Sequence, residues 1–239
     1  MKKVMVMMKM RSLTLGIIFF FSIIATAQAS NLVNNGDFDN IGSVWVNNTG
    51  FGSDDLQTAD FTSIPGWTNV PGFVNEFWFN GLSNSYYLTA SPGNGSAYAV
   101  DLTGQANNKP YGGLEQTITT TPGVQYELTF DLGSSTKWNN SANPAALTAS
   151  AKGAVLDASQ LFTLAPTSLN NWQSELLMFT ADSSSTTIEF LADSEYTFRY
   201  TGLDNVSVTP VSSVPEPATM LLLGLGLIGL AGVRKKIKK

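Results

Sequence analysis

Aromatic residues set in polar stretches are the first candidates for chemistry in this sequence. Trp138 comes just after an alternating apolar stretch and is followed by Asn139 and Asn140, so strand alternation does not explain this tryptophan. Sugars bind by packing their C–H faces on such rings while amides bond their hydroxyls. The pattern therefore predicts a carbohydrate-binding surface at Trp138, Asn139 and Asn140. Further ring platforms are expected at Trp78, Tyr86 and Tyr111.

Core packing is the alternative for each of these rings, because most aromatic side chains are largely buried. Trp67 and Trp172 are expected in the core. Exposed, coplanar rings beside Asn or Asp would favour a binding protein. Smooth polar loops would favour a structural protein without a specific ligand.

The acidic residues and two missing residue types bear on catalysis. The chain has no histidine and no cysteine, which excludes Ser-His-Asp and Cys-His catalysis and thiolate or imidazole metal sites. A glycoside hydrolase needs two carboxylates at a defined separation, and no motif here pairs two acids. We therefore expect a protein that is not an enzyme and requires no cofactor, with an unrecognised glycoside or polysaccharide hydrolase as the alternative.

Charge is segregated along the 239 residues. Four basic residues lie in the first eleven positions and five in the last six, whereas residues 30–210 hold four basic and 17 acidic residues, or 4 − 17 = −13. Phosphate neutralisation dominates nucleic-acid affinity, so an acidic body with four scattered cations excludes a nucleic-acid partner.

The basic N-terminus opens a secretory signal peptide at residues 1–29. An apolar stretch at residues 13–25 follows the cations, and Ala27 and Ala29 form an A-x-A cleavage site. The alternative is an uncleaved anchor, but the apolar run is short for a span of about 20 residues.

The C-terminus has three parts in order. A linker at 211–217 contains Val214, Pro215, Glu216 and Pro217; an apolar run follows at 218–233, and a basic tail at 234–239. The run predicts a single transmembrane helix of about 24 Å at 1.5 Å per residue. Lysine and arginine stay cytoplasmic, so the body is expected outside.

This tail resembles the PEP-CTERM sorting signal of Gram-negative bacteria, also catalogued as the ice-binding protein C-terminal domain. The resemblance covers residues 213–239. It implies recognition by an exosortase, a membrane transpeptidase, at the Pro-Glu-Pro motif. It also implies an inner-membrane intermediate and a destination at the cell surface or in an exopolysaccharide-containing extracellular matrix or biofilm. The alternative is an ordinary tail anchor.

Residues 30–210 read as one β domain. Alternating segments separated by turn residues predict strands, and no long helical period or internal repeat competes with them. Some eight to ten short strands favour an all-β, antiparallel two-sheet sandwich. The predicted strands are 32–38, 64–70, 96–102, 113–119, 124–132, 146–151, 172–180, 186–191 and 203–209.

Motifs in this body resemble galactose-binding-like jelly rolls, including carbohydrate-binding modules. The motifs occur in the family's order at 34–39, 64–67, 113–118, 122–126, 171–172 and 203–208. The resemblance implies a jelly roll with adjacent first and last strands. Many relatives hold a structural Ca²⁺ where these strands meet, which implies Asp39 and Asp204 as ligands, with Asp37 contributing. The alternative is that all three bond local backbone.

Together these patterns predict an exported surface or matrix protein whose sandwich binds polysaccharide. A structural matrix protein without a specific ligand is the alternative.

Overall fold

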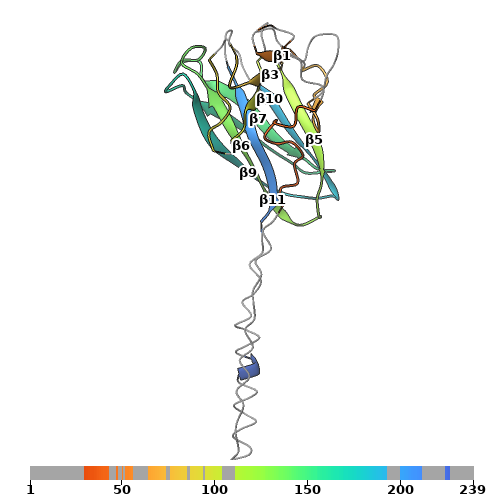
Figure 1. Ribbon diagram of the computed structural model, residues 1–239. Coiled ribbons are helices and arrows are strands. Elements are labelled where there is room, and N and C mark those ends of the chain that lie inside the picture. Colours follow the sequence, from red (N-terminus) through yellow and green to blue (C-terminus); the bar gives the residue numbers. More distant parts are fainter. Residues whose placement is uncertain are drawn as a thin grey trace, which may run out of the picture.

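The computed structural model describes residues 30–42, 47, 50, 52–55, 64–73, 76–84, 87–93, 95–103, 111–192, 200–211 and 224–226. Two antiparallel sheets pack face to face in it, as the sequence predicts (Figure 1). One sheet has six strands in the order β1 (Ser53–Asp55), β3 (Phe77–Asn80), β4 (Tyr98–Asp101), β11 (Gly202–Pro210), β6 (Gln125–Ser134) and β9 (Asn171–Thr180). The other has five in the order β2 (Thr68–Asn69), β5 (Gly113–Thr119), β10 (Ser185–Ala192), β7 (Ala145–Lys152) and β8 (Asp157–Leu164).

Alternation of side chains builds the core between the sheets. Every second residue of β5 and of the first half of β6 is buried, so each strand gives one face to the interior. Phe130 of β6 meets Phe162 of β8 and Phe190 of β10, with ring centroids 5.1 and 5.0 Å apart. Edge-to-face contacts of this kind hold the two sheets together.

The N-terminal segment lies along the last strand, as the resemblance implies, but it does not form the strand predicted at 32–38. The chain bends and turns there instead. Leu32 N donates to Val208 O at 2.9 Å, and Val206 N donates to Gly36 O at 2.8 Å. The segment therefore adds backbone bonds to β11 without continuing a regular ladder.

Three strands lie outside the predicted ranges: β1, β3 and β8. β8 was not predicted because its residues 159–161 are exposed in succession, so no alternation marks it. β3 contains Trp78, predicted as a ring platform, and this side chain is fully buried, with Nε1 donating to Phe38 O at 3.1 Å. Conversely, only Thr68–Asn69 of the stretch 64–70 forms a strand.

The two ends of the sandwich are distinct. We call the lower end the turns 120–124, 153–156 and 181–184 together with Val211. Backbone bonds join these parts: Thr120 N donates to Ser184 O, Gly123 N to Ala181 O, and Val211 N to Gln125 O. The upper end comprises the turn 135–139 after β6 and the connection 165–170 before β9. β11 therefore delivers the chain to the lower end (Figure 1).

The predicted cleavage site at Ala27 and Ala29 and the predicted sorting motif from Val214 to Pro217 lie outside the described residues. Of the apolar run, residues 224–226 are described and are helical. Within the described ranges, no helix reaches the length and hydropathy of a membrane span.

Candidate functional site

The turn that carries Trp138 is fixed by its own polar groups. Trp138 N and Asn139 N both donate to Ser135 O, at 3.0 and 2.7 Å, and Ser135 N donates to Asn139 Oδ1 at 3.0 Å. Thr136 N ties the turn to Ser168 O across the upper end. Asn139 is 5% exposed, so it positions the turn and does not face a ligand. This corrects its predicted role.

Lys137 joins the ring of Trp138 to the ring of Tyr87. The Lys137 ammonium lies 4.9 Å from the Trp138 ring centroid and 5.2 Å from that of Tyr87. Tyr87 is 69% exposed, and Trp138 is half-buried. Each cation–π contact at such a site contributes about 0.5–1 kcal/mol. One ammonium group thus contacts both rings, so Tyr87 and Trp138 lie near each other at the upper end.

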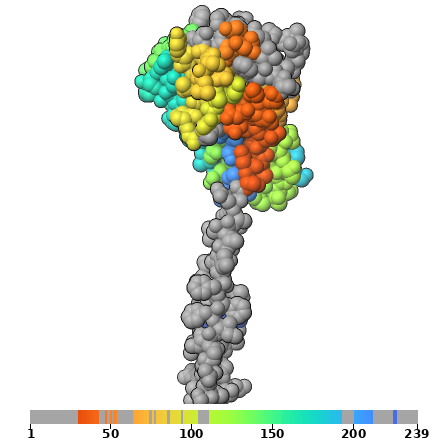
Figure 2. All heavy atoms as spheres, viewed as in Figure 1, coloured from red at the N-terminus to blue at the C-terminus, as the bar shows by residue number. Residues whose placement is uncertain are grey.

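The loop that carries Tyr87 is bound to the start of β9. Asn170 Oδ1 accepts from Thr89 N at 2.9 Å, and Asn170 Nδ2 donates to Tyr87 O at 3.1 Å. Trp172 Nε1 donates to Thr89 O at 3.1 Å. We call Tyr87, Lys137, Trp138 and Trp172 the aromatic patch. Figure 2 shows the residues around position 90 on the upper half of the molecule.

The sequence predicts that Trp172 lies in the core. In the structure it is only half-buried, at the edge of a second small core. This second core lies apart from the main one and packs under the patch. Its buried members are Phe79, Leu88, Ala90, Ala99 and Tyr200, with Trp138 and Trp172 packed against them. The Trp172 and Tyr200 rings meet edge-on at 6.2 Å. The patch therefore rests on a packed base.

A buried carboxyl pair anchors the same loop. Asp131 of β6 and Asp204 of β11 are directly opposite in the register. Ser91 N donates to Asp204 Oδ2 at 2.8 Å, and Ser91 Oγ donates to Asp131 Oδ2 at 2.6 Å. Asn205 Nδ2 also donates to Asp131 Oδ2, at 2.7 Å. The two carboxyl groups thus clamp the end of the loop that begins at Tyr87.

Burial raises the pKa of Asp204 to about 8, and the carboxylates of Asp131 and Asp39 raise it further. Asp204 is therefore mostly protonated at neutral pH, so the pair carries less than two negative charges. Burial also raises the pKa of Asp101 to about 6, against the hydrogen bonds from Thr103 and Thr201. Asp204 is fully buried and Asp131 is 9% exposed, so neither faces a substrate as a glycosidase carboxylate must.

The implied calcium ligands do not fit a Ca²⁺ shell. Asp39 Oδ1 accepts from Ala97 N, Tyr98 N and Ser96 Oγ at 2.9, 3.0 and 3.1 Å. Asp204 accepts from two backbone N–H groups, those of Ser91 and Asn205. Among the described residues, no three acids gather where they could hold a metal ion. Calcium takes six to eight oxygens, whereas these oxygens already serve N–H and O–H donors.

Asp37 has a separate place. Its Oδ1 accepts from Asp39 N at 3.4 Å, a local turn contact. It lines a pocket of about 320 Å³ between the N-terminal segment and β11, together with Asn31, Asn35 and Asn205. The three acids thus accept hydrogen bonds from protein donors: Asp37 within its own turn, Asp39 from residues 96–98 and Asp204 from Ser91 and Asn205.

Calcium is therefore expected to leave the stability of this protein unchanged. The melting temperature of the full chain, measured by circular dichroism in EGTA and in millimolar CaCl₂, should agree within about 1 °C, because a ligand that does not bind the folded state does not stabilise it. If CaCl₂ raised the melting temperature by several degrees and Asp39→Asn removed that rise, the result would contradict this prediction and support a calcium site at Asp39.

The other residues predicted to bind carbohydrate do not join the aromatic patch. Tyr111 is 3% exposed in the main core, so like Trp78 it presents no ring face to a ligand. Tyr86 lies outside the described residues. Asn140 is exposed at the upper end, where its side chain caps the backbone of Ala142 and Asn143.

The sequence prediction gave no binding role to Lys137 or Trp172, and of the adjacent pair Tyr86 and Tyr87 it selected Tyr86. Tyr87 stands beside Tyr86 in a polar stretch, which was the available signal. Its positive φ of 58° marks a tight turn that the sequence pattern does not reveal.

Solved structures with a similar arrangement include several carbohydrate-binding proteins. One is a putative sugar binding protein from Bacteroides thetaiotaomicron, with a TM-score of 0.44 and 11% identity over 76% of this chain and 100% of that one. Another is the CBM22-1 xylan-binding domain of Paenibacillus barcinonensis Xyn10C, with a TM-score of 0.41 and 14% identity over 68% and 94% of the two chains. A third is TmCBM61 in complex with β-1,4-galactotriose, with a TM-score of 0.42 and 13% identity over 77% and 100%.

Family models match both parts of the chain. None of the curated proteins compared with this chain matches it. Residues 213–236 match the PEP-CTERM protein-sorting motif, which confirms the predicted signal and implies an exported protein sorted at the cell surface. Residues 31–208 match the model described as "Protein of unknown function (DUF642)", so the chain belongs to the DUF642 family and carries a PEP-CTERM sorting motif.

Proposed function

We propose that this exported protein binds a neutral polysaccharide at the cell surface through the aromatic patch. The observation that carries the proposal is the pair of rings, Tyr87 and Trp138, that both contact the Lys137 ammonium. Rings fixed before binding cost little entropy when a sugar packs on them. A polysaccharide offers such rings repeated pyranose faces.

Charge favours a neutral glycan over a polyanion. Residues 30–210 carry 4 − 17 = −13 charges, so an acidic polysaccharide would be repelled at low salt. Of the two body cations in the described residues, Lys152 is paired with Glu189 at 2.6 Å. The other, Lys137, lies in the patch, where its ammonium can donate to sugar hydroxyls.

The sorting motif indicates where in the cell this binding would take place. An exosortase is the proposed processing partner, and the Pro-Glu-Pro segment is its proposed recognition site. The mature sandwich would then bind matrix polysaccharide at the surface or after release. Both steps agree with a chain that carries a sorting signal at one end and its aromatic patch at the far end of the domain.

The alternative is a structural surface protein without a specific ligand. The bonds from Asn170 to the Tyr87 loop would then serve rigidity alone. A hydrolase is the weaker alternative, because the buried carboxyl pair binds Ser91 and faces the protein interior.

Trp138→Ala is expected to weaken glycan binding by at least tenfold, because it removes one ring face. The full chain in detergent would be screened on an array of neutral and acidic polysaccharides, and the best ligand measured by calorimetry. A tenfold loss corresponds to about 1.4 kcal/mol. Tyr87→Ala should give a loss of similar size.

Leu169→Ala is the matched control, since Leu169 is an apolar side chain, 42% exposed, at the same end of the molecule. It should bind like the unaltered chain. Equal binding by Trp138→Ala would contradict the site. Failure of the folded chain to bind any glycan would favour the structural alternative.

A further inference from the structure

The turn between β7 and β8 exposes two apolar side chains at the lower end. Val155 is 85% exposed and Leu156 is 62% exposed. Two adjacent apolar side chains at a turn tip form a small exposed apolar surface, which becomes informative where further apolar surface adjoins it. Nothing in their own turn covers them.

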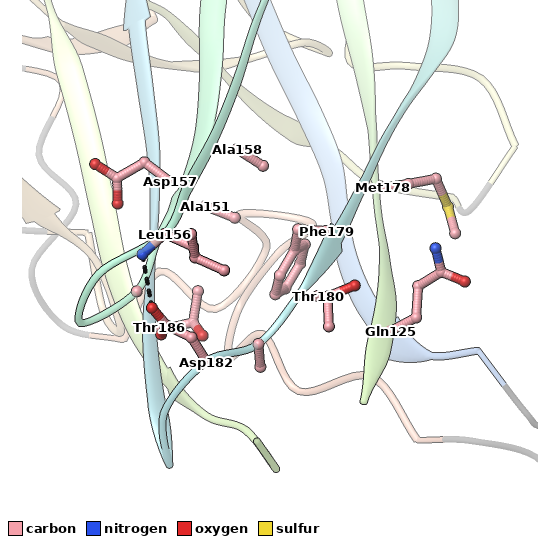
Figure 3. A pocket seen from close by; sticks show the side chains of 12 residues that line it. Gln125, Ala151, Leu156, Asp157, Ala158, Met178, Phe179, Thr180, Asp182 and Thr186 are labelled. Atoms are coloured by element: carbon pink, nitrogen blue, oxygen red, sulfur yellow. Dashed lines mark hydrogen bonds between the residues drawn. The ribbon is translucent and has the colours of Figure 1, made fainter. Parts of the chain in front are cut away.

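Asp182 holds this turn in one shape. Its carboxylate accepts from Ala154 N at 2.9 Å, Val155 N at 2.7 Å and Leu156 N at 2.6 Å. These backbone bonds lower the pKa of Asp182, so the carboxylate stays ionised and keeps them. Figure 3 shows the bond to Leu156. The two apolar side chains are therefore presented at a fixed place.

Apolar surface continues beside the turn into a pocket of about 330 Å³ (Figure 3). Leu156 and Ala158 line one side of it, and Met178 and Phe179 of β9 line the other. Met178 is 37% exposed. Thus the apolar surface extends from the turn tip to the edge of the six-stranded sheet.

The lower end is nearly uncharged although the body is acidic. The turns 120–124, 153–156 and 181–184 contain one ionisable side chain, that of Asp182, and its charge is met by three N–H donors. Such a surface neither attracts nor repels a zwitterionic lipid headgroup.

A short tether keeps this end close to the apolar run. β11 ends at Pro210, and Val211 still bonds to Gln125, so the described sandwich ends there. The apolar run begins at residue 218, seven residues later. Seven residues reach at most about 25 Å when fully extended. While the run spans a bilayer, the lower end is confined within that distance of the membrane surface.

We propose that Val155 and Leu156 dock on the outer surface of the membrane in which the chain is anchored. The bilayer is the occupant because the tether brings this end to it and the three turns carry one ionisable side chain, Asp182, with the exposed Asp157 following at the start of β8. Confinement raises the effective concentration of the turn at the surface, so a contact too weak for a free domain is populated in the anchored one. The docked sandwich then points its upper end away from the membrane. This inference does not rest on the proposed function.

A single-cysteine label tests the contact, since the chain has no cysteine of its own. The full chain with Val155→Cys would carry the fluorophore NBD and be reconstituted in phosphatidylcholine vesicles. The emission is expected to shift to the blue by about 10 nm or more, and lipids with a doxyl group near the headgroup should quench at least half of it. Leu156→Cys provides a second probe with the same expectation.

Leu169→Cys is the matched control, an apolar position exposed at the upper end. Its label should show neither the shift nor the quenching. Equal signals at positions 155 and 169 would overturn the proposal. So would a blue shift that grows with protein density but resists doxyl quenching, because a second copy of the chain would then cover the turn.

Discussion

Replacing Gly36 by alanine is expected to abolish the folded sandwich. A Cβ at this position would lie 1.9 Å from Val206 O and 2.9 Å from Val206 C, both backbone atoms of β11. The two segments cannot separate without breaking the bond from Val206 N to Gly36 O. Elsewhere Gly→Ala often stabilises by about 0.4–1 kcal/mol through the unfolded state, but here we expect a loss of more than about 4 kcal/mol.

Urea unfolding of the full chain in detergent, followed by tryptophan fluorescence, measures this loss. Gly42→Ala is the control, because its Cβ meets nothing within 4 Å while its φ of +52° still opposes alanine. That backbone conformation costs about 1–2 kcal/mol. If Gly36→Ala unfolds at the same urea concentration as Gly42→Ala, the N-terminal segment does not pack on β11 as described.

The protein is expected to lose stability as the pH rises from 4 to 8. Asp101 and Asp204 have pKa values of about 6 and about 8 in the folded chain, against 3.8 for an ordinary aspartate. At a pH above 3.8 and below the folded pKa of each group, the folded state holds a proton that the unfolded state has released. Their stabilisation is complete below pH 4 and is lost as the pH passes each folded pKa, at up to about 1.36 kcal/mol per pH unit and proton.

Asp204→Asn isolates the largest part of this dependence. Between pH 6 and 8 the Asp204 proton accounts for about 2–3 kcal/mol, or roughly 5–10 °C in melting temperature for a domain of this size. The variant keeps an acceptor for Ser91 N and carries no charge, so its melting temperature should fall much less over that range. It should also melt above the unaltered chain at pH 8, where Asp204 begins to ionise beside Asp131.

Asp157→Asn is the control for general charge effects, because Asp157 is an exposed residue of β8. It should follow the unaltered chain at every pH. A melting curve of Asp204→Asn that declines between pH 6 and 8 as steeply as the original would show that Asp204 is already ionised in the folded protein.

Local patterns were enough to predict most of the sandwich. In β5 and β6 apolar residues alternate with polar ones because one face meets the core and the other meets solvent. Trp78 was misread for a physical reason: β3 is covered on both faces, since Trp78 packs in the main core and Phe79 in the second core. Three consecutive aromatic residues then show no alternation.

The candidate site was only partly predictable. A tryptophan in a polar turn marked Trp138, but its partner Tyr87 is placed by bonds to Asn170, 83 residues away in sequence. Ser91 likewise meets Asp204 across 113 residues. Contacts of this range depend on strand order, which local sequence does not specify. The same strand order gives Asp39 and Asp204 different distant partners, residues 96–98 and Ser91.

The pairing of β6 with β11 decides how the domain would carry mechanical load. The turn with Trp138 leaves the upper end of β6, and the chain toward the sorting motif leaves the lower end of β11. Tension between a bound matrix and the cell would pull these neighbouring strands past each other lengthwise. Their ladder runs from Gly202–Gly133 to Asp204–Asp131 and, after a register shift, from Ser207–Thr129 to Pro210–Tyr126, and within each stretch the hydrogen bonds would share the shearing force. A strand peeled from one end would instead lose its bonds one at a time, so this topology suits a protein that holds under strain.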